Sequence, residues 1–302
     1  MTDQHLPRPP GRNPFVLWAV LFGSGTAWGA TQLFSKLSVA TGHPAIGIVL
    51  WQAVIGGVLL WGMLVISGQR LPLRRRHLGF YLVLGLLGTA LPHTLSYTAI
   101  RHLPVGVASI LIAVVPMMTL VLAVLAGVDR ASWRRVLGLV LGCVAVLLIL
   151  VPEASLPAKG QWFWAILPLM SALAYAAENV VIAKYQPREC TALQTMAGLT
   201  LGAIVLMLPA VALKGDWVDL TPFGPAERAI VITSVLHVLA YFGLVWLIGQ
   251  AGPIFSAQIG YIVTLSGVFL GMIFLGEVHA HWVWLSLALM LAGLALVKIR
   301  GS

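Results

Sequence analysis

The chain has 302 residues, of which 60% are hydrophobic and only 9% are charged, and its mean hydropathy is +0.97. A soluble domain is about 45–50% apolar and about 25% charged, so this composition excludes a soluble globular protein and, equally, a disordered one. The net charge of +9 could suit nucleic acid. In so apolar a chain, however, excess Lys and Arg is typical of loops that face anionic lipid headgroups, so we expect a membrane protein with no nucleic-acid partner.

Ten apolar segments follow one another along the chain, each about as long as a helix that crosses a bilayer. They are continuous, whereas the strands of a membrane barrel alternate in hydrophobicity over about ten residues. The expected fold is therefore an all-α integral membrane protein with ten transmembrane helices. The predicted spans cover residues 15–38, 44–67, 78–98, 103–127, 131–151, 161–184, 190–213, 226–250, 252–275 and 280–298.

The basic residues are divided unevenly between the segments that join these spans. If the N-terminus is cytoplasmic, thirteen Lys and Arg residues lie on the cytoplasmic side and five on the outer side. Cytoplasmic loops carry the excess of positive charge in membrane proteins. We therefore expect both termini to be cytoplasmic in a multi-pass protein of a bacterial-type inner membrane.

The second half of the sequence repeats features of the first. His93-x-x-x-Tyr97 in the third span matches His237-x-x-x-Tyr241 in the eighth, 144 positions later, and Pro104 matches Pro253, 149 positions later. Each half holds five predicted helices, so the halves would insert in opposite directions, as in many secondary transporters. The predicted divisions are an N-terminal tail (1–14), a first repeat (15–151), an outer connecting loop (152–160) and a second repeat (161–300).

Three motifs resemble those of the EamA-type branch of the drug/metabolite transporter superfamily. They are Trp28-Gly29 followed by Lys36, the run of residues 103–109 that leads to Pro116, and Gly276-Glu277 after the ninth span. The resemblance implies a ten-helix exporter similar to the amino-acid exporters of that branch. The chain departs from the pattern where Gln52 replaces a common Arg, where Val128-Asp129 replaces Gly-Glu, and where Leu265 replaces the proline of the second half.

Two histidines fall well inside predicted spans. Residues four apart share one face of a helix, so His93 projects with Tyr97 and His237 with Tyr241. Polar groups inside a membrane usually face the bundle interior or a water-filled cavity. The inverted repeat would bring both pairs to one central cavity as substrate-binding residues, although they could also simply hydrogen-bond the third span to the eighth.

Glu178 is the acidic residue that lies deepest in a predicted span. Burial disfavours its charged form, so it could exchange a proton or bind a substrate ammonium. The alternative is a structural role, as the partner of Lys184 or of backbone groups at a helix break.

Six further residues are candidates for contacts with substrate because they are polar or aromatic and lie within spans. An uncharged Gln at position 52 argues against a strongly anionic substrate, which would need Arg or Lys. The six are Trp28, Gln32, Gln52, Tyr175, Gln258 and Tyr261.

These features favour a secondary active or facilitative transporter that exports small metabolites by alternating access. The first substrate class is amino acids, including those with hydrophobic or aromatic side chains. The alternatives are efflux of drugs or other cationic compounds by proton antiport, a channel, and, more remotely, an intramembrane lipid-modifying enzyme. We see no nucleotide-binding P-loop and no metal-ligand spacing, so we expect no catalytic residues, no metal and no cofactor. The expected partners are a small-molecule substrate and the lipid bilayer, and the oligomeric state is left open.

Overall fold

Long apolar stretches of the chain form helices in lipid, because hydrogen bonds within the helix satisfy the backbone N–H and C=O groups where no water is present. The computed structural model describes residues 14–150, 162–256 and 258–298, and these residues form helices and connecting turns but no strand. The helices are α1 (Pro14–Ser38), α2 (Ala45–Ile66), α3 (Arg75–Gly85), the π-helical η1 (Leu86–Ala90), α4 (Leu91–Ile100), α5 (Val105–Ile112), α6 (Val115–Leu125), α7 (Trp133–Leu150), α8 (Trp162–Tyr185), α9 (Ala192–Lys214), α10 (Pro225–Ser256), α11 (Ile259–Leu275) and α12 (His281–Lys298).

In the described part of the chain, seven helical stretches are long and apolar enough to cross a membrane, which confirms the all-helical membrane fold. The stretches α11 and α12 are apolar but shorter, and α1 has the length at 25 residues but carries more polar side chains. The full count of ten spans therefore stays a prediction. The seven are Ala45–Ile66, Arg75–Ile100, Val105–Leu125, Trp133–Leu150, Trp162–Tyr185, Ala192–Lys214 and Pro225–Ala251.

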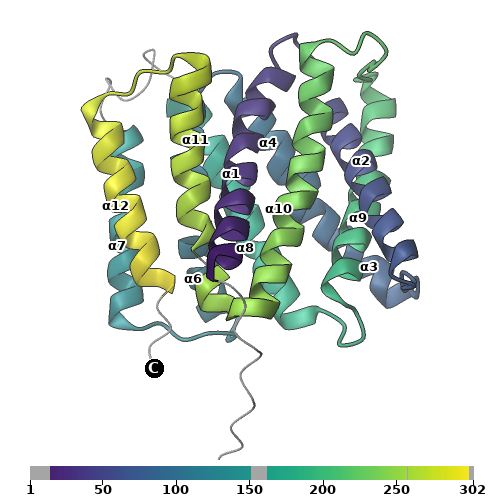
Figure 1. Cartoon of the computed structure of the whole chain (residues 1–302), viewed down its shortest axis with the longest axis horizontal. Helices are drawn as coiled ribbons and strands as arrows, with labels where there is room; N and C mark the ends of the chain where they lie inside the picture. The colour runs from purple at the N-terminus through teal and green to yellow at the C-terminus, as the bar shows by residue number, and fades with distance from the viewer. Residues whose placement is uncertain (1–13, 151–161, 257, 299–302) are drawn as a thin grey trace, which may run out of the picture.

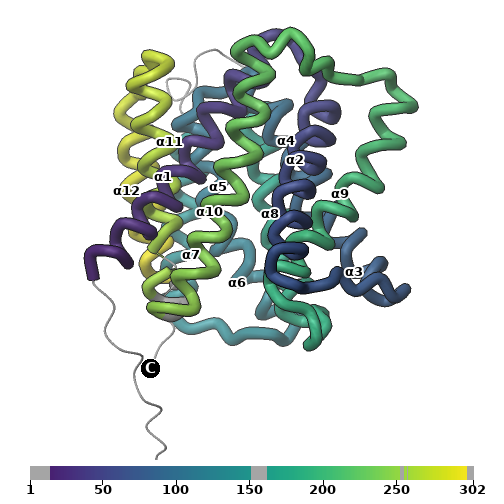
Figure 2. Tube along the Cα trace, turned by 45° about the vertical axis from the view of Figure 1, so that its right-hand side comes forward, coloured from purple at the N-terminus to yellow at the C-terminus, as the bar shows by residue number. Residues whose placement is uncertain are grey.

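The helices run up and down in one bundle, with α12 in front of α7 on one side and α2, α3 and α9 on the other (Figure 1). The end where α1 begins is called the lower end below, and the end where α1 finishes is called the upper end, as in Figure 1. Turned by 45°, the bundle shows α9 and α3 at one edge and α12 at the other (Figure 2).

Two prolines account for the interruptions in the third and fourth predicted spans. Pro92 has no N–H to donate to the carbonyl of Gly88, and the chain there widens into η1, where the Leu91 N–H bonds to the carbonyl of Leu86. Pro116 likewise follows the turn that separates α5 from α6. Each pair of segments nevertheless continues as one rod across the bundle.

The predicted boundary between the eighth and ninth spans is wrong. We expected a break between residues 250 and 252, before Pro253, but α10 continues to Ser256 and α11 begins only at Ile259. A proline removes one backbone donor, and the surrounding helical bonds still satisfy the other groups better than an open turn in apolar surroundings. A proline in an apolar segment is therefore a weak stop signal.

The largest apolar core lies between α5, α6, α7, α8, α11 and α12, and fully buried Ile110, Met117, Ile149 and Met290 belong to it. Apolar side chains within helices, such as Leu147 on α7 and Leu239 on α10, are instead exposed, at 54% and 58%. An outward apolar face of this kind suits contact with lipid rather than water.

Candidate functional site

Gln52 joins the two polar side chains that α4 presents on one face. Its Oε1 lies 3.0 Å from Nδ1 of His93, and its Nε2 donates to the hydroxyl of Tyr97. Ser35 of α1 adds a second bond to the same hydroxyl, at 3.2 Å. Gln52 and Tyr97 are buried, with 8% and 3% of their surface exposed, so the network lies inside the bundle and links α1, α2 and α4.

The second half of the chain adds His237 to this network from the opposite side. The rings of His93 and His237 have centroids 5.6 Å apart, and Trp28 packs edge-on to His237 at 5.8 Å. Tyr175 of α8 contacts His93 in the same way, at 6.2 Å. The structure thus brings together the two histidines that the sequence repeat related, and it surrounds them with aromatic rings.

His93, His237, Trp28 and Tyr175 are only half-buried. Neutral imidazole, amide and phenol groups both donate and accept hydrogen bonds. Such a group of side chains can bind a polar uncharged or zwitterionic molecule and can stack against an apolar one.

Glu178 of α8 lies against the π-helical segment of the third span. A Cβ atom added at Gly88 would overlap the carboxylate oxygens of Glu178, so the glycine provides the space that this carboxylate fills. Tyr175 lies three residues before Glu178 on the same helix. Lys184, which we considered as its partner, is directed elsewhere: its Nζ donates to the carbonyl of Ala126 at 3.3 Å.

The contacts described so far do not include three of the candidate residues. Gln32 is half-buried on α1, and Gln258 immediately precedes α11. Tyr261 packs against the large apolar core.

The upper end of the bundle holds a second set of buried polar contacts, which the sequence did not predict as a unit. Lys36 donates to the carbonyls of Ile100 and Leu103, at 2.6 and 2.9 Å. Glu277 accepts from the backbone N–H of Val105 at 2.5 Å and from that of Gly106 at 3.0 Å. Both residues stand out in the sequence as motif positions, but only the fold shows that they bind the same turn.

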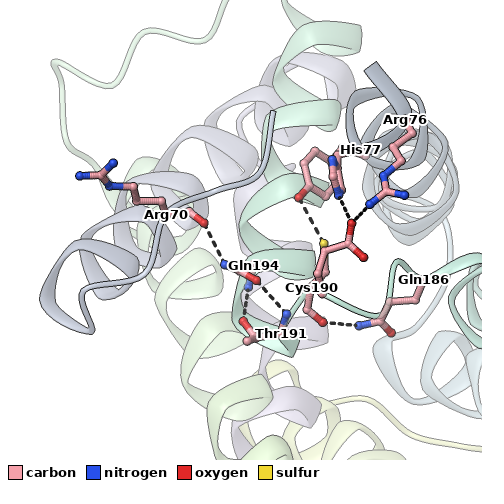
Figure 3. Close-up of polar contacts among 9 residues, drawn as sticks. Arg70, Arg76, His77, Gln186, Cys190, Thr191 and Gln194 are labelled. Carbon is pink, nitrogen blue, oxygen red and sulfur yellow. Dashed lines mark hydrogen bonds and ion pairs between the residues drawn. The ribbon is translucent and has the colours of Figure 1, made fainter. Parts of the chain in front are cut away.

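The lower end carries a third polar cluster, between the start of α3 and the segment that leads into α9 (Figure 3). Glu189 bonds to Arg76 and, at 3.0 Å, to Nε2 of His77. Thr191 and Gln194 form a reciprocal capping box at the start of α9, and Gln194 also bonds to the carbonyl of Arg70. These bonds satisfy a helix end and fasten two loops from different halves, which is a structural role.

Among the residues that the structure describes, seven apolar helices of spanning length enclose a polar network, and this arrangement defines an integral membrane protein with an inward-facing polar site. Residues 15–151 match the EamA-like transporter family. The resemblance drawn from the motifs is thereby confirmed over the first half of the chain, and the protein is a membrane transporter.

The chain is also similar to individual transporters over most of its length. It is 25% identical over 295 residues to the "Uncharacterized inner membrane transporter YedA" of Escherichia coli strain K12, covering 95% of this chain and 92% of that one. It is 25% identical over 193 residues to an "Uncharacterized transporter" of Archaeoglobus fulgidus, covering 63% of this chain and 65% of the relative. A crystal structure with 15% sequence identity matches with a TM-score of 0.64 over 93% of this chain and 96% of its own, which shows a shared fold.

Proposed function

We propose that this transporter exports small metabolites, with amino acids as the substrate class, by alternating access around the network of Gln52, His93 and His237. The observation that carries the proposal is the 5.6 Å separation of the two imidazole rings, which come from α4 in one half and α10 in the other. A site shared by two halves of a transporter can be exposed to one side and then to the other as the halves move.

Helix pairing supports the division into two inverted repeats, residues 15–151 and 161–300. The contacts of α1 with α10 correspond to those of α8 with α4, and α1 with α11 corresponds to α8 with α5 and α6. The matched helices α1 and α8 run in opposite directions through the bundle (Figure 1). In the same scheme α2 packs on its own counterpart α9, and α7 on α12.

The orientation in the membrane follows from charge. The loops of the lower end contain Arg70, Arg74 and Arg130, and Arg134 lies in the first turn of α7 there, whereas the described part of the upper end has few basic residues. Lower-end loops rich in Lys and Arg are expected in the cytoplasm. A relative that is named as an inner membrane transporter supports the bacterial inner membrane as the location.

Amino acids suit the site because it combines neutral polar groups with aromatic rings. His93, Gln52 and Tyr97 offer hydrogen bonds without a full positive charge, while Trp28 and Tyr175 offer apolar surface. This combination supports zwitterions with hydrophobic or aromatic side chains rather than strongly anionic metabolites.

The test is transport of labelled leucine and phenylalanine by the purified protein in liposomes. We expect flux above that of empty vesicles, and a fall of at least ten-fold in His93→Ala and in His237→Ala. The control is His281→Ala, because His281 is exposed at the start of α12 and outside the network. No flux with either amino acid overturns the substrate class, and wild-type rates in both variants overturn the site.

Efflux of cationic compounds by proton antiport is the second candidate, and it is favoured by the buried carboxylate of Glu178. A resistance profile in a host that lacks its own efflux pumps separates the two candidates. Protection against cationic dyes without amino-acid flux would select this second function.

A further inference from the structure

Glu178 is an acidic side chain held deep in the bundle. Only 9% of its surface is exposed, and its carboxylate packs directly against the glycine at position 88. The third span is widened into a π-helix at this point. π-helical turns inside α-helices occur frequently at functional sites.

No basic side chain lies near this carboxylate in the described part of the chain. The helices that pack on α8 are α3, η1, α4, α5 and α6, and among them Lys or Arg occurs only in the first turn of α3. Arg76 is twelve residues before Gly88, about 18 Å along a helix at 1.5 Å per residue. Lys184, on α8 itself, bonds to Ala126.

An ionised carboxylate without a counter-ion is expensive in such surroundings. The neighbours that Glu178 does have are aromatic and polar. Tyr175 lies three residues before it on α8, close to one turn of helix, and the Tyr175 ring also contacts His93 of the central network. Carboxylate and phenol oxygens accept the three N–H bonds of an ammonium group, and aromatic faces attract its charge.

We propose that Glu178 binds the ammonium group of the transported molecule, with Tyr175 one turn away on α8, while the central network binds the rest. The proposal rests on the transport function given above and narrows it to primary amines and amino acids. It also gives the widened third span a reason, since Gly88 is what lets a carboxylate and an ammonium group approach that helix.

The test compares ligands that share a side chain and differ in the head group. Thermal stabilisation of the purified full-length protein is measured with leucine, isopentylamine and 4-methylpentanoate, and with phenylalanine, 2-phenylethylamine and 3-phenylpropionate. We expect the amino acids and amines to stabilise the wild type and the two acids to fail. In Glu178→Gln the stabilisation by amines is lost, and Glu178→Asp retains part of it.

A pair of glycine variants keeps the test independent of removing the acid. Gly88→Ala places a methyl group where the Glu178 carboxylate lies, so affinity for the amines should fall at least ten-fold. Gly79→Ala in the same span meets nothing within 4 Å and should bind as the wild type does. Unfolding of each variant without ligand verifies that it is folded.

Several results would overturn the proposal. They are stabilisation by the acids, no stabilisation by any amine, and amine binding that survives Glu178→Gln. A variant that loses only the response of transport to a pH gradient, while binding amines normally, would make Glu178 a proton site instead. Amino-acid flux that persists in Glu178→Gln overturns this inference but leaves the proposed function intact. Amine binding that depends on Glu178, without any amino-acid flux, supports this inference but overturns the proposed function.

Discussion

Lys36 and Glu277 bind opposite sides of a single turn, the one that joins α4 to α5. The ammonium group of Lys36 lies at the carbonyl end of α4, 2.6 Å from the Ile100 oxygen, and the carboxylate of Glu277 lies at the N–H end of α5. Each charge has the sign that the partial charge of its helix end requires. Since Lys36 belongs to α1 and Glu277 follows α11, the pair ties three separate parts of the bundle together at the upper end.

Loss of the carboxylate should loosen this turn. In Glu277→Gln the two backbone N–H groups lose a charged acceptor, and hydrogen bonds to charged groups contribute about 1.5–3 kcal/mol. We expect faster hydrogen exchange over residues 101–108, measured by mass spectrometry on the protein in detergent, and Lys36→Met should do the same. Asp219→Asn is the control, because Asp219 is an exposed acid of the same end that bonds to Thr221 in its own turn. Exchange that stays unchanged in both variants would show that the turn is held by packing alone.

The buried imidazole next to Glu277 predicts a dependence of stability on pH. Burial lowers the pKa of His279, although the nearby Glu277 acts in the opposite direction. The folded protein therefore favours neutral His279, whereas the unfolded chain binds a proton below about pH 6.5. The stability that neutral, buried His279 contributes to the folded protein is fully present above about pH 6.5 and is lost as the pH falls below this value.

The measurement is the unfolding temperature of the wild type and of His279→Gln between pH 8 and pH 5. We expect the wild type to lose more stability than the variant over this range, since the side chain of His279 is only 2% exposed. Equal losses in the two proteins would contradict a role for His279, and other titrating groups would then account for the slope.

The sequence predicted much of the fold because hydrophobic length decides it. The third predicted span, 78–98, appears as the rod Arg75–Ile100, and the seventh, 190–213, as α9 over Ala192–Lys214. The juxtaposition of His93 and His237 was also predictable, since an inverted repeat places matched residues at the same depth. Their binding of substrate stays a proposal.

What the sequence could not predict depends on contacts between distant segments. The space at Gly88 becomes visible only when α8 is placed against η1, and the acceptor role of Glu277 only when α11 ends beside α5. The continuation of α10 past Pro253 was mispredicted because the matched Pro104 does begin a new helix in the first half.

Gln52 should control the central network, because it bonds to both His93 and Tyr97. Gln52→Leu keeps the approximate volume but removes the partner of the half-buried His93 and leaves the buried Tyr97 hydroxyl with the bond from Ser35, and an unsatisfied buried polar group costs about 1–3 kcal/mol. We expect amino-acid flux in liposomes to fall at least ten-fold. Ser35→Ala removes only the 3.2 Å bond to Tyr97 and should reduce flux less than three-fold. An equal loss in both variants would mean that Tyr97, rather than Gln52, organises the site.

Gly202 lies where the backbone of α9 approaches the backbone of α3, and a substitution there tests helix packing apart from transport. A Cβ atom at position 202 would overlap the backbone carbonyl of Tyr81, which cannot move aside as a flexible side chain could. Overpacking of this kind costs about 1–3 kcal/mol, so Gly202→Ala should lower the unfolding temperature. Gly62→Ala on α2 meets nothing within 4 Å and should leave the unfolding temperature unchanged or slightly raised, since alanine favours helix.

Because Gly202 lies outside the central network, flux per folded molecule should stay at the wild-type level in both variants. A Gly202→Ala protein that unfolds at the wild-type temperature would show that α3 and α9 can separate at no cost.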